Sequence, residues 1–364
     1  MNASSVYFDS VIRQQNTQGI SIISPAPRDA WEDLVKSDPQ TLTCQTSAWT
    51  DCLCSSGGYQ DASRLYHLPD GRRLLLPLVR QRGWPAFLAT QASFPNSWGI
   101  GGPLVSDQLT ANDVTLIMAD LAAQPVLRTI IRPNPLLGDV WATAHMPRVM
   151  AEPRRAHVLD LEGGFDRVWE KRFNHRTRTK VRQAERAGLT IECDTSGRLA
   201  SVFYELFLQS VDRWAQKQHE PRYLAHWRAQ RRDPLEKIQA IAQGQGNACR
   251  IWAAWLDGQP VAAIMVLLGK NAHCTRGAMN KCLTSQTRAN ELLHRLAIEE
   301  ACQAGCRYYH LGETGQSRSL AQYKEGLGAV PYAYAEYRVE WLPVTRVDRL
   351  LRRGVKRLIG FKDV

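Results

Sequence analysis

The sequence has no run of about 20 apolar residues, the length that a helix needs to cross a lipid bilayer. Its nine cysteines include no Cys-x-x-Cys pair, and its histidines are not paired at the spacing of a zinc site. The N-terminus lacks the basic start and apolar centre of a secretory signal. We therefore expect a cytoplasmic protein with reduced thiols and no metal, with a peripheral position at the inner membrane face as an alternative.

Two further patterns are missing, and each excludes a type of chemistry. No Ser/His/Asp or Cys/His arrangement can be recognised by its spacing, so no catalytic nucleophile is predicted. Residues 281–290 (KCLTSQTRAN), between a predicted strand and a predicted helix, contain no glycine. Glycines at such a junction let backbone amides approach a pyrophosphate, so their absence argues against a standard coenzyme A cradle there.

The length and charge of the chain limit its organisation. A chain of 364 residues suits two domains, and 44% hydrophobic with 22% charged residues is typical of a globular protein. Residues 167–186 hold eight Lys or Arg against two Glu, and residues 344–364 hold seven against two Asp. These two segments account for the whole net charge of +11, so anionic partners are expected at particular places.

The order of predicted elements between residues 251 and 340 indicates one architecture. Two apolar runs flank Asp257-Gly258, a strong hairpin signal. Further elements follow in the order strand, helix, strand, helix and strand, at residues 272–280, 287–305, 308–312, 319–326 and 331–340. This order resembles the back half of an acyltransferase fold of the GNAT type.

Specific motifs extend this resemblance. Residues 308–312 (YYHLG) and 320–329 (LAQYKEGLGA) resemble the aromatic-x-Gly and Phe-Lys-x-x-Phe-Gly signature of the Fem peptidoglycan-bridge aminoacyltransferases. The FemAB-like or CelD-like acetyltransferases of exopolysaccharide clusters share this signature. Residues 173–188 (FNHRTRTKVRQAERAG) are similar to the Asn/Arg-rich helix of that family. Residues 86–104 are similar to the strand that ends in Gly-Gly-Pro in the first half of the family's fold.

The resemblance implies an α/β (α+β) fold with two tandem GNAT-like domains, each a mixed, mostly antiparallel sheet flanked by helices. We expect the first domain over residues 1–150 and the second over 151–343, with a helical insertion at 199–245.

Lys324 is the main candidate catalytic residue. By itself a lone lysine on a short helix is read as a surface residue, but the resemblance places the matching lysine in the acyl-transfer site. Acyl transfer passes through a tetrahedral oxyanion, which a fixed ammonium group stabilises. His310 and Glu313 flank a strand end and are candidate bases for the acceptor proton, with structural hydrogen bonding as the alternative.

The basic segment at residues 166–187 predicts one amphipathic helix. An apolar stripe is expected on one face and arginines at a spacing of four on another. Like charges at that spacing repel each other, so the row is read either as a phosphate-binding wall or as a solvated face. The proposed substrate-binding residues are Asn174, Arg176, Arg178, Arg182 and Tyr323.

The C-terminal segment 344–364 predicts a basic amphipathic helix. Its apolar positions oppose a face of arginine and lysine: Val347, Leu350, Leu351, Leu358 and Ile359. Such a helix suits the surface of an anionic membrane, and a tail packed on the protein body is the alternative.

Together these features predict an acyltransferase that acts on an amine or hydroxyl of a cell-envelope, peptidoglycan or exopolysaccharide precursor. The donor is expected to be acyl-coenzyme A or an aminoacyl-tRNA, with no tightly bound cofactor. The acceptor is expected to be anionic, either lipid-linked or nucleotide-linked. The alternatives are an aminoacyl-tRNA-dependent, peptide-bond-forming enzyme of a small-molecule pathway, and a non-catalytic nucleic-acid-binding protein that uses the basic helix.

Overall fold

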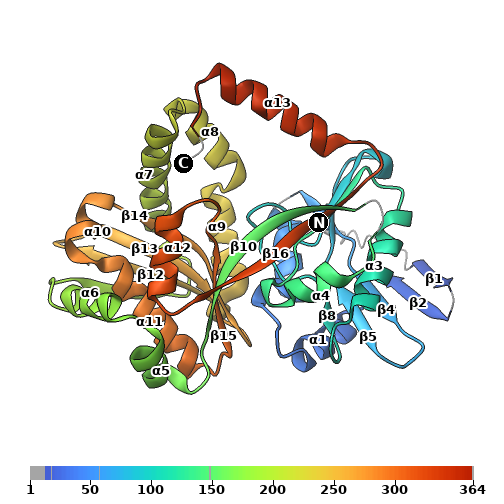
Figure 1. Cartoon of the computed structure of the whole chain (residues 1–364), viewed down its shortest axis with the longest axis horizontal. Coiled ribbons are helices and arrows are strands. Elements are labelled where there is room, and N and C mark those ends of the chain that lie inside the picture. Colours follow the sequence, from blue (N-terminus) through green and yellow to red (C-terminus); the bar gives the residue numbers. More distant parts are fainter. Residues whose placement is uncertain (1–12, 18, 57, 147–148, 363–364) are drawn as a thin grey trace, which may run out of the picture.

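The computed structural model describes residues 13–17, 19–56, 58–146 and 149–362, arranged as two halves that share a large sheet (Figure 1). Residues 1–12 of the predicted first domain and residues 363–364 of the predicted tail lie outside this described part.

The first half contains two groups of strands and four α-helices. Strands β1, β2, β4, β5 and β8 form a five-stranded antiparallel sheet, and β3, β6, β7 and β9 belong to a larger one. The elements are β1 (Arg13–Thr17), β2 (Ile20–Ser24), α1 (Arg28–Ser37), α2 (Ser47–Ser56), β3 (Tyr59–Asp61), β4 (Arg64–His67), β5 (Arg73–Leu76), β6 (Val79–Gln81), β7 (Thr90–Ala92), β8 (Leu104–Val105), α3 (Ala111–Ala123), β9 (Arg128–Ile131) and α4 (Gly138–Thr143).

The second half continues the larger sheet and adds most of the helices. Three helices, α7 to α9, lie between β11 and β12, where the sequence predicts a helical insertion. The elements are β10 (Met150–Asp160), α5 (Gly164–Arg167), α6 (His175–Glu185), β11 (Thr190–Asp194), α7 (Ala200–Gln218), α8 (Arg222–Arg232), α9 (Leu235–Gln245), β12 (Cys249–Leu256), β13 (Gln259–Leu267), β14 (Ala272–Met279), α10 (Lys281–Thr287), α11 (Ala289–Gln303), β15 (Tyr308–Glu313), α12 (Arg318–Gly326), β16 (Val330–Glu340) and α13 (Val344–Leu358).

The long strands β10 and β16 join the two halves. They pair antiparallel from Met150 opposite Arg338 to Val158 opposite Val330, and the end of β16 then pairs with β9. The larger sheet therefore has eleven strands, in the order β11-β12-β13-β14-β15-β10-β16-β9-β7-β6-β3. The predicted mixed, mostly antiparallel α/β architecture is confirmed. A division near residue 150 stays a prediction, because β10 and β16 connect both sides.

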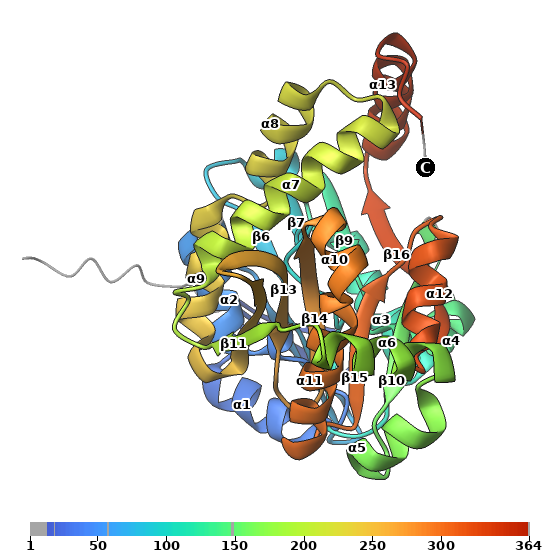
Figure 2. The same cartoon turned by 90° about the vertical axis from the view of Figure 1, so that its left-hand side faces the viewer.

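Helices cover both faces of the second half of this sheet. Strand β13 is almost completely buried, and its alternate side chains enter two different cores, as the period of a strand requires. Ala263, Met265 and Leu267 pack with the insertion helices α7 and α9, whereas Ile264 and Val266 pack with α11. Figure 2 shows α7 and α9 on the outer side of these strands.

The parallel strands β14 and β15 are paired only at their beginnings. Ala272 lies opposite Tyr309 and His273 opposite His310, and beyond these two pairs the strands diverge. The connection between them runs through α10 and α11, as parallel strands need a crossover. The divergence leaves the carboxyl ends of β14 and β15 without a common ladder, and the functional site described below lies there.

The predicted continuous helix over residues 166–187 is wrong. The chain forms α5, a π-helical turn at Val168–Arg172 and then a new helix, α6, after an extended residue at Phe173. The side-chain oxygen of Asn174 accepts a hydrogen bond from the Thr177 amide (2.7 Å), a standard N-cap. The backbone N–H of Asn174 donates to the backbone carbonyl of Gly326 (3.0 Å), so a tertiary contact fixes the position of the break.

This contact brings together two sequence motifs that are about 150 residues apart. The turn after α12 packs directly on the turn before α6, and Gly328 allows the approach. Its φ is +83°, and a Cβ there would lie 2.6 Å from the Cβ of Arg172 and 2.7 Å from its carbonyl oxygen. Both the backbone conformation and the close contact require glycine at this position.

We expect Gly328→Ala to lower the free energy of unfolding by about 2–4 kcal/mol, because it adds a backbone clash to the strain of a positive φ. Gly305→Ala is the matched control, since Gly305 has a φ of +77° but no atom within 4 Å of the position that a Cβ would occupy. That variant should lose only about 1 kcal/mol in urea denaturation. Equal losses in both variants would contradict the close packing of α6 on α12.

Candidate functional site

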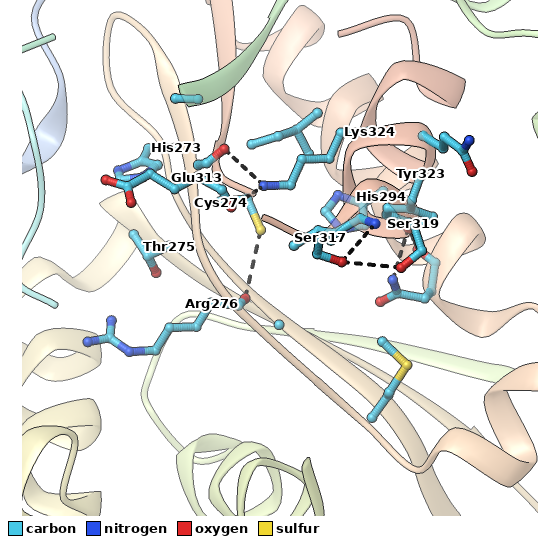
Figure 3. A pocket seen from close by; sticks show the side chains of 18 of the residues that line it. His273, Cys274, Thr275, Arg276, His294, Glu313, Ser317, Ser319, Tyr323 and Lys324 are labelled. Carbon is cyan, nitrogen blue, oxygen red and sulfur yellow. Dashed lines mark hydrogen bonds between the residues drawn. The ribbon is translucent and has the colours of Figure 1, made fainter. Parts of the chain in front are cut away.

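A cavity of about 1440 Å³ lies where β14 and β15 diverge, and it is lined by residues of both halves. The first half contributes Trp49, residues 96–100 and Arg132, and β10 and β16 contribute Arg154, Ala156, Tyr334 and Glu336. The remaining walls come from strands β14 and β15, from helices α6, α7, α10, α11 and α12, and from Arg232 and Asp233 at the end of α8. Figure 3 shows side chains of β14, β15 and α12 that face this space.

Lys324 on α12 is buried at the wall of the cavity, with only 6% of its surface exposed. Its Nζ donates hydrogen bonds to the backbone carbonyls of Gly312 and Glu313, each at 2.9 Å (Figure 3). Burial lowers the pKa of Lys324 to about 8, against the opposing effects of Cys274 and Glu313. The structure thus places a fixed, partly desolvated ammonium group where β15 ends.

Glu313 is the last residue of β15, and its backbone carbonyl is one of the two that accept from Lys324. One oxygen accepts a hydrogen bond from the Tyr334 hydroxyl (2.6 Å), and the other lies 3.4 Å from an Arg154 nitrogen. Burial, followed by the Glu313 charge, raises the pKa of Tyr334, so this tyrosine stays a donor. The Glu313 side chain remains 39% exposed, and it lines the cavity.

The three histidines of this region are neutral at pH 7. Burial lowers the pKa of His273 to about 4 and those of His294 and His310 to about 3. His273 and His294 line the cavity, but His310 does not. His310 is 1% exposed and its ring packs edge-on against His273, so the geometry argues against His310 as the base that receives the acceptor proton.

The arginines that the sequence predicts as one wall have three different positions. Asn174 and Arg176 line the cavity. Arg178 instead donates to the carbonyl oxygens of the preceding turn, those of Trp169, Glu170 and Phe173. Arg182 borders a separate notch with Arg186 and Gln286. All three arginines lie on α6, after the break. Arg176 and Arg178 are two residues apart and so lie on roughly opposite sides of the helix, and Arg178 folds back onto the preceding turn.

Tyr323 also lines the cavity. Its hydroxyl accepts from the side chain of Asn290 (2.9 Å) and donates to the carbonyl of the same residue (3.2 Å). The structure therefore brings five of the predicted site residues to one space, and leaves three outside it. Those at the cavity are Asn174, Arg176, Glu313, Tyr323 and Lys324; those outside are Arg178, Arg182 and His310.

Most of the charged lining residues are not predicted from the sequence. The cavity has eleven Lys or Arg in its lining against five Asp or Glu, so it favours an anionic ligand. The cationic residues beyond Arg176 and Lys324 come from scattered positions of the chain: Arg132, Arg154, Lys180, Arg213, Lys217, Arg232, Arg276, Lys281 and Arg288. Arg213 and Lys217 are four residues apart on α7, and Lys180 belongs to the basic segment that the sequence singles out; the other positions carry no local signal.

In the glycine-free junction after β14, backbone amides at the start of α10 already donate hydrogen bonds within the protein. The side-chain oxygen of Asn280 accepts from the amides of Cys282 (3.1 Å) and Leu283 (3.3 Å) and so caps α10. These are the amides that would face a pyrophosphate at a helix N-terminus. The structure agrees with the inference that this junction is not a standard phosphate cradle.

The described residues contain neither a metal-binding cluster nor a membrane span. No group of three His, Cys, Asp or Glu side chains in the described part of the chain is placed to hold a metal ion. No helix within the described ranges combines the length and apolarity needed to span a bilayer. The nine cysteines are all free thiols.

Comparisons with known proteins agree with this geometry. Residues 171–325 match a family model described as an acetyltransferase (GNAT) domain. A comparison with curated protein sequences found no match. Among solved structures, FemX is 13% identical, with a TM-score of 0.51 over 92% of this chain and 98% of FemX. A conserved protein of unknown function from Bacteroides thetaiotaomicron VPI-5482 is 11% identical, with a TM-score of 0.52 over 90% and 98%.

At such identities the solved structures show the fold alone, and the family model identifies the domain that contains most of the cavity wall. The matched residues run from the turn before α6 to the helix that carries Lys324. Residues 171–325 are therefore a GNAT acyltransferase domain, within a chain that has the fold of FemX.

Proposed function

We propose that this enzyme transfers an acyl or aminoacyl group to an amine or hydroxyl of an anionic cell-envelope or polysaccharide precursor. The observation that carries the proposal is the position of Lys324, buried between two carbonyl groups at the wall of a large, cationic cavity. Both expected donors, acyl-coenzyme A and aminoacyl-tRNA, are cytoplasmic molecules, so we place the reaction in the cytoplasm.

The role proposed for Lys324 is to stabilise the oxyanion of the tetrahedral intermediate. An ammonium group has three donors, and two of them are used by the carbonyls of Gly312 and Glu313. The third N–H is left for a ligand in the cavity. Because the two carbonyls fix the group before the substrate arrives, little reorganisation is needed as negative charge develops.

Glu313 is the proposed base. The acceptor nitrogen or oxygen attacks the acyl carbon, its proton passes to the Glu313 carboxylate, and the bond to the donor's leaving group then breaks. The exposed part of this carboxylate faces the cavity, while Tyr334 and Arg154 hold it in place. A base must be oriented as well as accessible, and this arrangement supplies both.

The cationic lining is proposed to bind the charged part of the acceptor. Arg176 is exposed at the cavity and is not held by carbonyl groups, unlike Arg178. Arginine and lysine from both halves would meet phosphate groups from opposite sides, as pyrophosphate-linked precursors require.

A screen of donors and acceptors tests the function. Purified enzyme is incubated with acyl-coenzyme A or aminoacyl-tRNA, and with nucleotide-linked sugars, lipid-linked precursors or small amines, and products are identified by mass spectrometry. Turnover with a small amine alone would favour a small-molecule pathway. Nucleic-acid binding that weakens steeply with salt, without any turnover, would instead support a non-catalytic binding protein.

We expect Lys324→Met to reduce kcat by about 10²–10³-fold, because the variant lacks the charge that stabilises the oxyanion. Its free energy of unfolding should fall by only about 1–3 kcal/mol, since two carbonyls lose a partner but a desolvated charge is also removed. Lys171→Met, on an exposed residue outside the cavity lining, is the control and should keep the parent activity. Near-normal turnover by Lys324→Met would remove the proposed role.

The pKa of Lys324 predicts a pH dependence. Activity should decrease as the pH rises through about 8, because the proposed role requires the protonated amine. This residue does not destabilise the fold over that range: its folded pKa lies below the unfolded value, so its contribution to stability rises between about pH 8 and 10.5. The measurement is the pH profile of kcat with a hydroxyl acceptor, so that no acceptor amine titrates in this range.

Lys237→Met serves as the control for that profile. Burial also lowers the pKa of Lys237 to about 8, but this residue pairs with Asp233 and does not line the cavity. The decrease in activity above pH 8 should therefore persist in Lys237→Met. If the decrease were absent in Lys237→Met, the titrating group would be Lys237 and not Lys324.

Charge reversals on α6 should have three distinct effects. Arg176→Glu is expected to raise the KM for the acceptor about tenfold or more with unchanged stability, since it places repulsive charge at the cavity. Arg178→Glu should instead reduce the free energy of unfolding by about 1–3 kcal/mol, because three carbonyl oxygens lose their donor. Arg182→Glu should change neither value. Identical behaviour of all three in kinetics and urea denaturation would mean that α6 is only a solvated face.

A further inference from the structure

Exposed apolar side chains gather on three segments of the structure. Of the fourteen large apolar residues that are exposed in the described part of the chain, eleven belong to these segments. Trp214 and Leu320 line the cavity, and Val330 stands alone at the start of β16. The eleven are Trp84, Phe87 and Leu88 before β7; Tyr223 and Trp227 on α8; and Trp341, Leu342, Val347, Leu350, Leu351 and Val355 at the C-terminus.

Backbone hydrogen bonds show that these segments are neighbours. The Leu127 amide donates to the Ala89 carbonyl (3.1 Å), and the Trp341 amide donates to the Leu127 carbonyl (3.3 Å). The connection before β7 therefore adjoins the start of the C-terminal segment. At the other end, the Lys362 amide donates to the Gln218 carbonyl (2.9 Å), at the end of α7 and just before α8.

Helix α13 consequently bridges the two aromatic groups. Its 15 residues correspond to a length of about 22 Å. Figures 1 and 2, which share a vertical axis, place α13 and α8 at the same end of the molecule. We call the surface formed by residues 84–88, α8 and residues 341–355 the apolar end face.

The apolar stripe of α13 is not covered by the protein. Val347, Leu350, Leu351 and Val355 follow the spacing of one helix face, and each is between 51% and 66% exposed. An amphipathic helix of a globular protein normally turns such a stripe to the core. Here the helix is held near its start by the Arg349–Glu152 ion pair (3.0 Å) and beyond its end by Lys362, while the stripe remains open.

The charges around the stripe indicate what covers it. Residues 344–362 contain seven Lys or Arg and one Asp, and Arg346, Arg353 and Arg357 are exposed beside the stripe. Helix α8 adds four arginines, of which Arg222, Arg228 and Arg232 are ion-paired with Asp212, Glu220 and Asp233. A second copy of this chain would bring like charges together, whereas an anionic lipid surface neutralises them. Exposed tryptophan and tyrosine are the side chains that prefer the interface of a bilayer.

We propose that the apolar end face docks on the surface of an anionic lipid bilayer, with α13 lying in the plane of the interface and the aromatic groups at both ends inserting beside it. The docking surface thus extends beyond the C-terminal helix to two segments far from it in the sequence. Lys217 and Gln218 line the cavity, and Gln218 also holds Lys362. The cavity therefore adjoins the membrane, within reach of a lipid-linked substrate.

The test is co-sedimentation of the full chain, without any substrate, with phosphatidylcholine vesicles that contain about 30% phosphatidylglycerol, and with pure phosphatidylcholine vesicles. We expect binding to the anionic vesicles only, and a loss of binding at about 0.5 M salt, where screening is strong. The double variant Leu350→Asp/Leu351→Asp should lower the partition coefficient about tenfold or more. Phe87→Asp and Trp227→Asp should each lower it several-fold, and Val330→Asp should not change it.

Several results would overturn the proposal. These are no binding by the parent protein, equal binding to both vesicle types, or parent-like binding by Leu350→Asp/Leu351→Asp. Normal binding by both Phe87→Asp and Trp227→Asp would restrict the contact to α13 and so contradict an extended face. A parent dimer in light scattering that these substitutions dissociate would make the face an interface between copies. Circular dichroism verifies that each variant is folded, and because no substrate is present, the outcome is independent of the acyl-transfer assay.

Discussion

The antiparallel pairing of β10 with β16 is the constraint on which the rest of the structure depends. It makes one eleven-stranded sheet from strands of both halves, and β10 also pairs with β15, the strand that ends at Glu313. Arg132 and Arg154 are ion-paired with Glu336 across this region. Burial tends to raise the pKa of Glu336, but Arg132 and Arg338 lower it, so the charge stays. The charged wall of the cavity is therefore held by strand pairing and by ion pairs.

The chemistry proposed for this cavity depends on removing Lys324 from water while keeping it hydrogen-bonded. Two backbone carbonyls accept from its ammonium group, and no carboxylate oxygen of the described residues is among its hydrogen-bond partners. A carboxylate partner would neutralise the field that the lysine presents to a substrate, whereas carbonyl dipoles fix its position and leave its charge available. The neutral, buried histidines beside it add no competing charge.

Helix α13 both packs against the protein at its ends and exposes an apolar stripe. Helix α13 closes the chain over one end of the molecule, and its ends are held by β10 and by α7. The same placement leaves its apolar stripe facing outward, where the aromatic side chains of two other segments also emerge. In our proposal, the bilayer supplies the apolar contact that the protein core does not.

The sequence by itself determined most of the local elements and the resemblance to GNAT acyltransferases. Asp257-Gly258 forms the predicted hairpin turn, in which both residues adopt a positive φ, and the predicted order of strands and helices follows it with one additional helix, α10, before α11. Lys324, Asn174 and Tyr323 could be predicted because they belong to short motifs, and Glu313 because it directly follows one. Only the tertiary structure decided that Arg178 caps a broken helix, that His310 is buried away from the cavity, and that Arg132 and Arg154 line it. These facts depend on strand pairing and packing between residues up to about 200 positions apart, and hydrophobic periodicity carries no information about such distant contacts.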